Sequence, residues 1–112
     1  MRKKFLIVTD RIGRGDDELG ATLMANVLGY LAKAGSAPTD IILLNDGVRL
    51  ACKGSAVLDS LKALAGRGTV IRSCITCLRR FDLVDSLAVG EIGTMPGTVE
   101  LLTADEGVVT IA

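Results

Sequence analysis

Short, continuous apolar runs alternate with segments of helical periodicity along this chain, and this alternation constrains the fold more than any other feature. The runs are rich in Val, Ile and Leu, as expected of strands that are buried on both faces. Alternating strands and helices predict an α/β fold with a mostly parallel sheet and helices on both of its faces. The predicted strands cover residues 5–9, 40–44, 69–73, 92–93 and 107–111.

The predicted helices rest on capping residues and on the spacing of apolar side chains. The first begins at Asp16 or Asp17 and ends at Ala34, because acids occupy its first turn and Gly35 follows its last. Residues 48–53 fit neither a helix nor a strand. The other predicted helices are 55–65 with Ser55 as N-cap, 76–80 with a continuation over 84–89, and 96–104 with Pro96 at the N1 position.

Length and composition predict a single domain that spans residues 1–112. The chain is long enough to bury one core, and 49% of its residues are hydrophobic. The apolar run near the N-terminus is too short for a signal peptide, and no run approaches the roughly 20 residues of a membrane span. We therefore expect a cytoplasmic protein whose three cysteines are thiols rather than disulfides.

Charge and hydrophobicity indicate which partners to expect. Thirteen basic residues cancel thirteen acidic ones, which leaves no broad positive surface for nucleic acid. A chain of little net charge has little self-repulsion to keep copies apart. The apolar side of the first predicted helix is wide enough to leave oligomerisation open. Neither nucleic acid nor a membrane is an expected partner.

The loops that follow the strands form the expected ligand-binding edge. Right-handed crossovers bring these loops to one edge of a parallel sheet, and ligands of open α/β sheets bind there. The segment 73–77 is expected at this edge. The other residues expected there are Asp10, Gly13, Gly15, Asn45 and Gly47.

The segment Gly13-Arg14-Gly15 suggests a nucleotide site, because it follows a strand and precedes a helix. The dinucleotide fingerprint needs a third glycine where Glu18 stands, and the phosphate-loop pattern is absent. Asp16 and Asp17 would also repel a phosphate at this helix start. We therefore expect a tight turn before an acid-capped helix, and no nucleotide cofactor.

The stretch from Arg72 to Arg80, RSCITCLRR, carries the strongest chemical signal. Cys74 and Cys77 stand at CxxC spacing after a strand, with Arg72, Arg79 and Arg80 close in sequence. A helix N-terminus and nearby cations both stabilise a thiolate. We interpret Cys74 as the nucleophile and Cys77 as a resolving or second acceptor thiol. The alternative is that both cysteines are small buried hydrophobes.

Other chemistries receive less support. Cys52 is interpreted as a packed thiol, since free cysteine is among the most buried residue types. A structural zinc site prefers four Cys and His ligands, whereas this chain has three Cys and no His, so no metal is expected. The absence of His also removes the Ser-His-Asp arrangement of hydrolases.

Four motifs in order resemble the DsrE/DsrF-like sulfur-relay family. They cover nearly the whole chain and are most similar to the DsrE-like domain of the YedF type, which is described as sulfurtransferase-like and associated with selenium metabolism. Together the motifs are fairly specific for this subgroup, although none would be alone. The motifs are GRGDDELG at 13–20, LNDGV at 44–48, SCITCL at 73–78 and LAVGE at 87–91.

The resemblance implies a three-layer α/β/α fold with a five-stranded sheet, and homo- or hetero-oligomers. It also implies that the family's active cysteine, which falls on Cys74, carries sulfur as a persulfide between partner proteins. Cys77 is then the extra thiol of the subgroup's C-x-T-C pattern. YedF-type proteins usually carry a small TusA-like domain before this one, so this chain is expected to receive sulfur from a separate TusA-like donor.

Three hypotheses follow. The leading one is a sulfurtransferase or sulfur-relay protein in which the Cys74 thiolate accepts sulfane sulfur and passes it to an acceptor. The second is a thiol–disulfide redox module that uses Cys74 and Cys77 without sulfur transfer. The third is a non-catalytic oligomeric or ligand-binding module, which would keep both thiols buried and unreactive.

Overall fold

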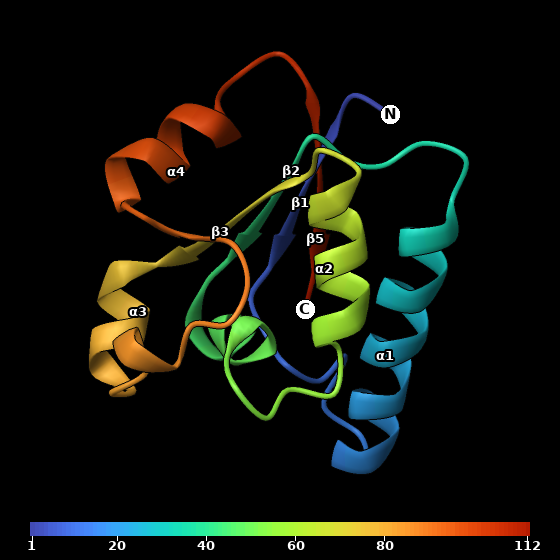
Figure 1. Cartoon of the computed structure of the whole chain (residues 1–112), viewed down its shortest axis with the longest axis vertical. Coiled ribbons are helices and arrows are strands. Elements are labelled where there is room, and N and C mark those ends of the chain that lie inside the picture. The colour runs from blue at the N-terminus through green and yellow to red at the C-terminus, as the bar shows by residue number, and fades with distance from the viewer.

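The computed structural model describes all 112 residues and contains one sheet of five parallel strands in the order β4-β3-β2-β1-β5 (Figure 1). The strands are β1 (Lys3–Ile7), β2 (Asp40–Leu43), β3 (Val70–Cys74), β4 (Glu91–Gly93) and β5 (Gly107–Ile111). The α-helices are α1 (Asp17–Lys33), α2 (Leu58–Gly66), α3 (Ile75–Arg80) and α4 (Met95–Leu102), and the 3-10 helices are η1 (Asn45–Ala51) and η2 (Val84–Ser86).

The connections place the helices on two sides of the sheet and confirm the predicted α/β/α fold. From β1 to β4 each crossover moves one strand in the same direction, so right-handed connections put α1 and α2 on one face, where they pack together (Figure 1). The chain then returns from β4 to β5 across the whole sheet, which puts α4 on the opposite face. Helix α3 lies at the carboxyl end of β3, against η1.

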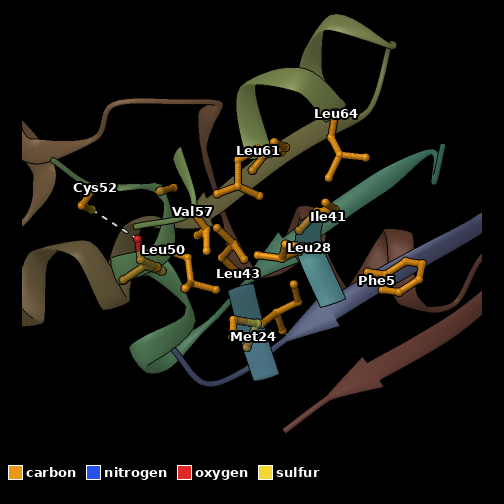
Figure 2. Close-up of a cluster of buried hydrophobic side chains, with 14 of the residues drawn as sticks. Phe5, Met24, Leu28, Ile41, Leu43, Leu50, Cys52, Val57, Leu61 and Leu64 are labelled. Atoms are coloured by element: carbon orange, nitrogen blue, oxygen red, sulfur yellow. Dashed lines mark hydrogen bonds between the residues drawn. The ribbon is translucent and has the colours of Figure 1, made fainter. Parts of the chain in front are cut away.

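The hydrophobic core lies on the α1 and α2 side of the sheet (Figure 2). Alternate strand residues such as Phe5, Ile41 and Ile71 point to this side and meet Leu28 from α1 and Leu61 from α2. Each fully buried leucine or isoleucine contributes roughly 1.5–3 kcal/mol from apolar burial. This layer therefore holds most of the fold's stability, and α1 and α2 are anchored by it.

The opposite face of the sheet is polar at its centre. Lys4 and Asp40 are in register on β1 and β2, and Arg72 of β3, two residues beyond the partner of Asp40, forms ion pairs with Asp40 and with Glu91. Lys4 is 2% exposed and its ammonium group lies 3.5 Å from Glu106. Charged side chains that are removed from water in this way need partners. The row of alternating charges supplies most of them and forms the surface beneath α4.

Several element boundaries differ from the sequence prediction for local reasons. The first strand ends at Ile7 instead of Thr9. Thr9 belongs to the following turn, where its hydroxyl donates to the Arg11 carbonyl (2.6 Å). The predicted cap Ser55 does not cap a helix. Its hydroxyl accepts from the Val57 N–H (3.2 Å), and α2 begins only at Leu58.

Near the C-terminus, α4 begins at Met95, one residue earlier than expected. Thr94 is its N-cap, with its hydroxyl accepting from the Gly97 N–H, and Pro96 therefore occupies the second helical position. The expected continuation over 84–89 is limited to the single 3-10 turn η2. None of the helices combines the length and the apolar character needed to cross a membrane.

Of the segment 48–53, which fitted neither pattern, residues 48–51 belong to η1, which begins at Asn45 shortly after β2, and Cys52 follows as its C-cap. Gly47 allows this segment to lie against β1. A Cβ atom at Gly47 would stand 2.2 Å from the Ile7 carbonyl oxygen, which is far inside contact distance. Glycine at this position therefore brings η1, including its first residue Asn45, close to the carboxyl ends of the strands.

Candidate functional site

Cys74 is the last residue of β3, and α3 begins at the next residue. Cys74 itself keeps an extended backbone, with φ −61° and ψ 126°, so the chain turns sharply into the helix. The first N–H groups of a helix have no partners within it and carry partial positive charge. At this corner Cys74 is the N-cap residue of α3, and the groups of Thr76 and Cys77 in the first turn of the helix lower the pKa of its thiol. Helix α3 thus places unpaired backbone donors around a thiol, as the sequence predicted.

The Cys74 side chain is buried on the α4 side of the sheet. Along β3 it alternates with Ile71, which faces the opposite core, and Cys74 and Ile42 are the buried apolar residues that lie outside that core. Its neighbour in register on β4 is Gly93, which has no side chain to cover it. Cys74 is nevertheless 1% exposed.

Two opposing influences act on the Cys74 proton. Burial by itself raises the pKa of the thiol, because a charged sulfur loses water. Hydrogen bonds from the backbone N–H and thiol of Cys77, and from the backbone and hydroxyl of Thr76, lower the pKa and outweigh burial. The pKa of Cys74 is therefore below that of an ordinary thiol, which favours the nucleophilic thiolate.

Cys77 has the opposite tendency. Burial raises its pKa, the adjacent Cys74 raises it further, and a hydrogen bond from the Asn45 N–H (3.1 Å to the sulfur) lowers it only in part. Asn45 has φ +52°, a left-handed conformation that asparagine tolerates better than most residues. The pair is thus divided into Cys74, whose pKa is lowered, and Cys77, whose pKa is raised, so Cys74 loses its proton more easily.

The three arginines lie elsewhere than expected, and this corrects the prediction that they support the thiolate. Arg72 points toward Asp40 and Glu91, so its charge is already paired. Arg79 and Arg80 stand in the last turn of α3, exposed to solvent and at the end of the helix opposite to Cys74. None of the three is among the groups that shift the pKa of Cys74. The peptide groups of α3 take the role that the sequence assigned to guanidinium groups.

The predicted loop residues lie at the carboxyl edge but have separate roles. Asp10 borders a cavity of about 310 Å³ together with Arg49, Lys53 and apolar residues of α1. Gly13 has φ +81°, and its N–H donates to the carbonyl of the C-terminal residue Ala112 (3.2 Å). Gly15 has open space around it. Of the loop residues, Asn45 alone contacts the thiol pair directly, with Gly47 bringing its segment into place.

Cys52 is buried at 3% exposure, and its thiol donates to the Val48 carbonyl (3.2 Å; Figure 2). Burial raises the pKa of Cys52, and Arg49 lowers it only in part. A buried thiol of raised pKa is a poor nucleophile. The structure therefore places Cys52 in the core, as the interpretation of a packed thiol requires.

Sequence reasoning missed two contributors to the site. Thr76 lies within the motif SCITCL but has no predicted role, although both its backbone and its side chain lower the pKa of Cys74. The position of Thr76, two residues after a cysteine that ends a strand, is the signal that could have identified it. The contact between Asn45 and Cys77 joins residues 32 apart in sequence, and no local pattern indicates it.

Comparisons with known proteins agree on the architecture. The protein of unknown function MTH1491 from Methanobacterium thermoautotrophicum is 22% identical over 97% of both chains, with a TM-score of 0.69. The ychN protein from E. coli is 22% identical over 98% of this chain and 99% of its own, with a TM-score of 0.68. The protein of unknown function BT1422 from Bacteroides thetaiotaomicron is 17% identical over 97% of this chain and 94% of its own, with a TM-score of 0.65. No protein-family model and no curated protein matches the sequence. By these similarities, the chain has the α/β fold of these three proteins.

Proposed function

We propose that this protein is a sulfur carrier that holds sulfane sulfur as a persulfide on Cys74. The observation that carries the proposal is the position of Cys74 at the end of β3 and at the N-terminus of α3, where Thr76 and Cys77 lower the pKa of its thiol. A persulfide carries its charge on the outer sulfur and needs the same kind of donors. The resemblance to DsrE/DsrF-like sulfur-relay proteins of the YedF type, which places the active cysteine at Cys74, supports the same function.

The proposed loading step moves one sulfur atom without a net change of oxidation state. The Cys74 thiolate attacks the outer sulfur of a donor persulfide, the donor's S–S bond breaks, and the electron pair leaves with the donor thiolate. Cys77 can then attack the inner sulfur of the Cys74 persulfide, which forms a Cys74–Cys77 disulfide and releases hydrosulfide. In that second step the carried sulfur is reduced and the two cysteines are oxidised.

A second candidate function uses the same pair as a thiol–disulfide redox module. The position of both cysteines at the first turn of α3 favours it, because each of them shifts the pKa of the other. A low pKa on one cysteine and a higher pKa on the other is also the usual division within a reactive CxxC pair. The reduction potential of the pair, measured in glutathione buffers, tests this candidate. A pair that forms no disulfide under oxidising buffer removes it.

The carrier function is tested by loading the protein with sodium tetrasulfide and measuring its intact mass. We expect wild-type protein and Cys52→Ala to gain one sulfur atom that a reductant removes. Cys74→Ser should gain none. Cys77→Ser should keep its added sulfur longer than the wild type, since the resolving thiol is gone. Equal loading of Cys74→Ser and wild type would contradict the proposal, as would wild-type protein that gains no sulfur.

The near-complete burial of Cys74 favours the remaining hypothesis, a non-catalytic module, and gives it a direct test. Native protein is treated with iodoacetamide, and the labelled residues are identified by mass spectrometry. A carrier requires Cys74 to react in folded protein, and to react before Cys52. A native protein in which Cys74 labels only after unfolding would favour the non-catalytic module.

A further inference from the structure

We infer that the exposed side of α4 is the docking surface for the sulfur-donor protein, and that this partner presents apolar side chains surrounded by lysines and arginines. The inference rests on the proposed function of Cys74. The docking surface, called the α4 surface below, consists of Met95, Val99 and Leu102 together with the acids Glu91 and Glu100. Three independent features of the molecule support it.

The first feature is that α4 exposes its apolar side. Its buried residue is Thr98, and a cavity of about 450 Å³ beside Arg72 is lined by Thr94, Gly97, Thr98 and Leu101, with the exposed Glu100 and Ala104 at its border. Met95 and Val99, by contrast, are 46% and 50% exposed. A helix of a globular protein normally turns its apolar side to the core. The small, polar inner side and the exposed apolar side of α4 are the arrangement expected of a helix whose second partner is another molecule.

The second feature is the distribution of charge. All thirteen lysines and arginines lie within residues 1–80, and residues 81–112, which include α4, contain no basic residue. The acids of this last segment are Asp82, Asp85, Glu91, Glu100, Asp105 and Glu106. Glu91 pairs with Arg72 and Glu106 pairs with Lys4, and the other four acids of the segment, Glu100 of α4 among them, leave it with a net negative charge. Complementary potentials steer proteins together and reject partners of like charge, so a partner seated on α4 carries positive charge.

The third feature is the position of Cys74. Gly93 pairs with Cys74 across the sheet, and the N-cap of α4, Thr94, is the next residue. The Cys74 side chain also lies on the α4 face of the sheet, whereas α1 and α2 cover the other face. A partner that exchanges sulfur must bring its own sulfur to covalent distance. Docking on the α4 surface puts the partner on the face of the sheet that holds the thiol, and docking on α1 would leave the sheet between the two sulfurs.

The exchange on this surface conserves atoms and electrons. The donor's cysteine persulfide presents its outer sulfur, the Cys74 thiolate attacks that sulfur, and the new S–S bond forms as the donor's S–S bond breaks. The donor leaves as a thiolate, and Cys74 carries the persulfide. No oxidant or reductant is needed, so the partner's contribution is its persulfide and its complementary surface.

The test compares two sulfur donors, a persulfide-loaded TusA-like carrier protein and sodium tetrasulfide. The variants are Met95→Ser/Val99→Ser and Glu100→Lys, whose side chains are exposed and outside the thiol site. We expect transfer from the carrier protein to be about tenfold slower in both variants, because docking contacts and steering charge are lost. Transfer from tetrasulfide should be unchanged. Added salt should slow the carrier reaction of wild-type protein more than that of Glu100→Lys.

Matched controls lie on α1, on the other side of the sheet. Leu19→Ser/Tyr30→Ser removes two large side chains that are more exposed than Met95 and Val99, and Glu18→Lys makes the same change of charge as Glu100→Lys. Both controls should transfer sulfur at the wild-type rate from either donor. Thermal unfolding of each variant shows that the fold is kept.

Three results would overturn the inference while leaving the sulfur-carrier function standing. In the first, the α4 variants accept sulfur from the carrier protein at the wild-type rate. In the second, tetrasulfide loads wild-type Cys74 but the carrier protein does not. In the third, the α4 variants change the molar mass measured by light scattering, which would show that a second copy of this chain occupies the surface. Failure of tetrasulfide to load wild-type Cys74 would instead overturn the proposed function, and this inference with it.

Discussion

The hydrogen bonds at the β3–α3 corner give two identical side chains different affinities for a proton. Cys74 lies at the start of α3 and receives donors from Thr76 and Cys77, which lower its pKa in spite of burial. Cys77 lies one turn later, where burial and the neighbouring sulfur raise its pKa. Position along a single helical turn therefore decides which cysteine is the nucleophile.

Removing the Cys77 thiol should raise the pKa of Cys74. In Cys52→Ala/Cys77→Ala protein, Cys74 loses one of the donors that stabilise its thiolate. Thiolate absorbance at increasing pH should show Cys74 titrating below the usual value of about 8.5 in Cys52→Ala, and closer to that value in the double variant. Cys52→Ala also serves as the control for loss of a buried thiol. Identical titration curves for the two proteins would contradict the assigned hydrogen bond.

The lowered pKa of Cys74 also makes stability depend on pH with a definite sign. Between the folded and the unfolded pKa, folded Cys74 has lost its proton while the unfolded chain still binds it. The free energy of unfolding should therefore rise as pH increases through this interval, and the gain should be lost as pH falls through the folded pKa. Urea titrations of Cys52→Ala and Cys52→Ala/Cys74→Ala at several pH values isolate the effect, because both proteins keep the Cys77 thiol that lowers the pKa of Cys74.

At the level of the elements, Gly47 should be the glycine least tolerant of a side chain. Alanine at this position would place Cβ 2.2 Å from the Ile7 carbonyl oxygen, so η1 and β1 would have to separate. We expect Gly47→Ala to cost about 3 kcal/mol or more in the free energy of unfolding. Gly29→Ala is the matched control. Gly29 lies within α1 with open space around it, and the change should stabilise the protein by about 0.5–1 kcal/mol. Similar urea midpoints for both variants would contradict this account.

Helix caps give a second contrast among the elements. Asp16 caps α1 through a 2.8 Å hydrogen bond from the Leu19 N–H, whereas Ser55 precedes α2 without capping it. Asp16→Ala should therefore cost about 1 kcal/mol. Ser55→Ala should cost less, since it removes only the local bond to Val57. Urea denaturation of both variants checks the prediction, and a larger loss for Ser55→Ala would show that the helix begins at Ser55 after all.

The same comparison shows what sequence could predict. Periodicity and turn residues located all five strands and four α-helices to within a few residues, because each depends on neighbours along the chain. The α3 donors at Cys74 were predicted for the same reason. The pairing of Arg72 with Asp40 depends on strand register, and the contact of Asn45 with Cys77 on how η1 meets α3. These relations join distant segments, so local patterns assigned Arg72 to the thiol and left Asn45 without a partner.

In the molecule as a whole, the helical layer on one face of the sheet is stabilised by much more apolar burial than the layer on the other face. Helices α1 and α2 share a continuous apolar core with the sheet, and α1 buries Gly20, Met24 and Leu28. Helix α4 buries Thr98 and faces a cavity above paired charges. Apolar burial is the main favourable term in folding, so the cost of local opening should differ between the two layers.

Native-state hydrogen exchange should resolve this asymmetry. We expect the amides of α4, residues 95–102, to exchange through local opening of low free energy, while those of β2 and the centre of α1 exchange only through global unfolding. Low denaturant should then accelerate exchange at β2 more than at α4, because global opening exposes more surface. Equal protection of α4 and β2 would contradict a difference in stability between the two layers.

Helix α4 lies over the face of the sheet that holds Cys74, so its local opening should also set how often the buried thiol meets a donor. The rate at which iodoacetamide labels Cys74 should therefore follow the exchange rate of the α4 amides.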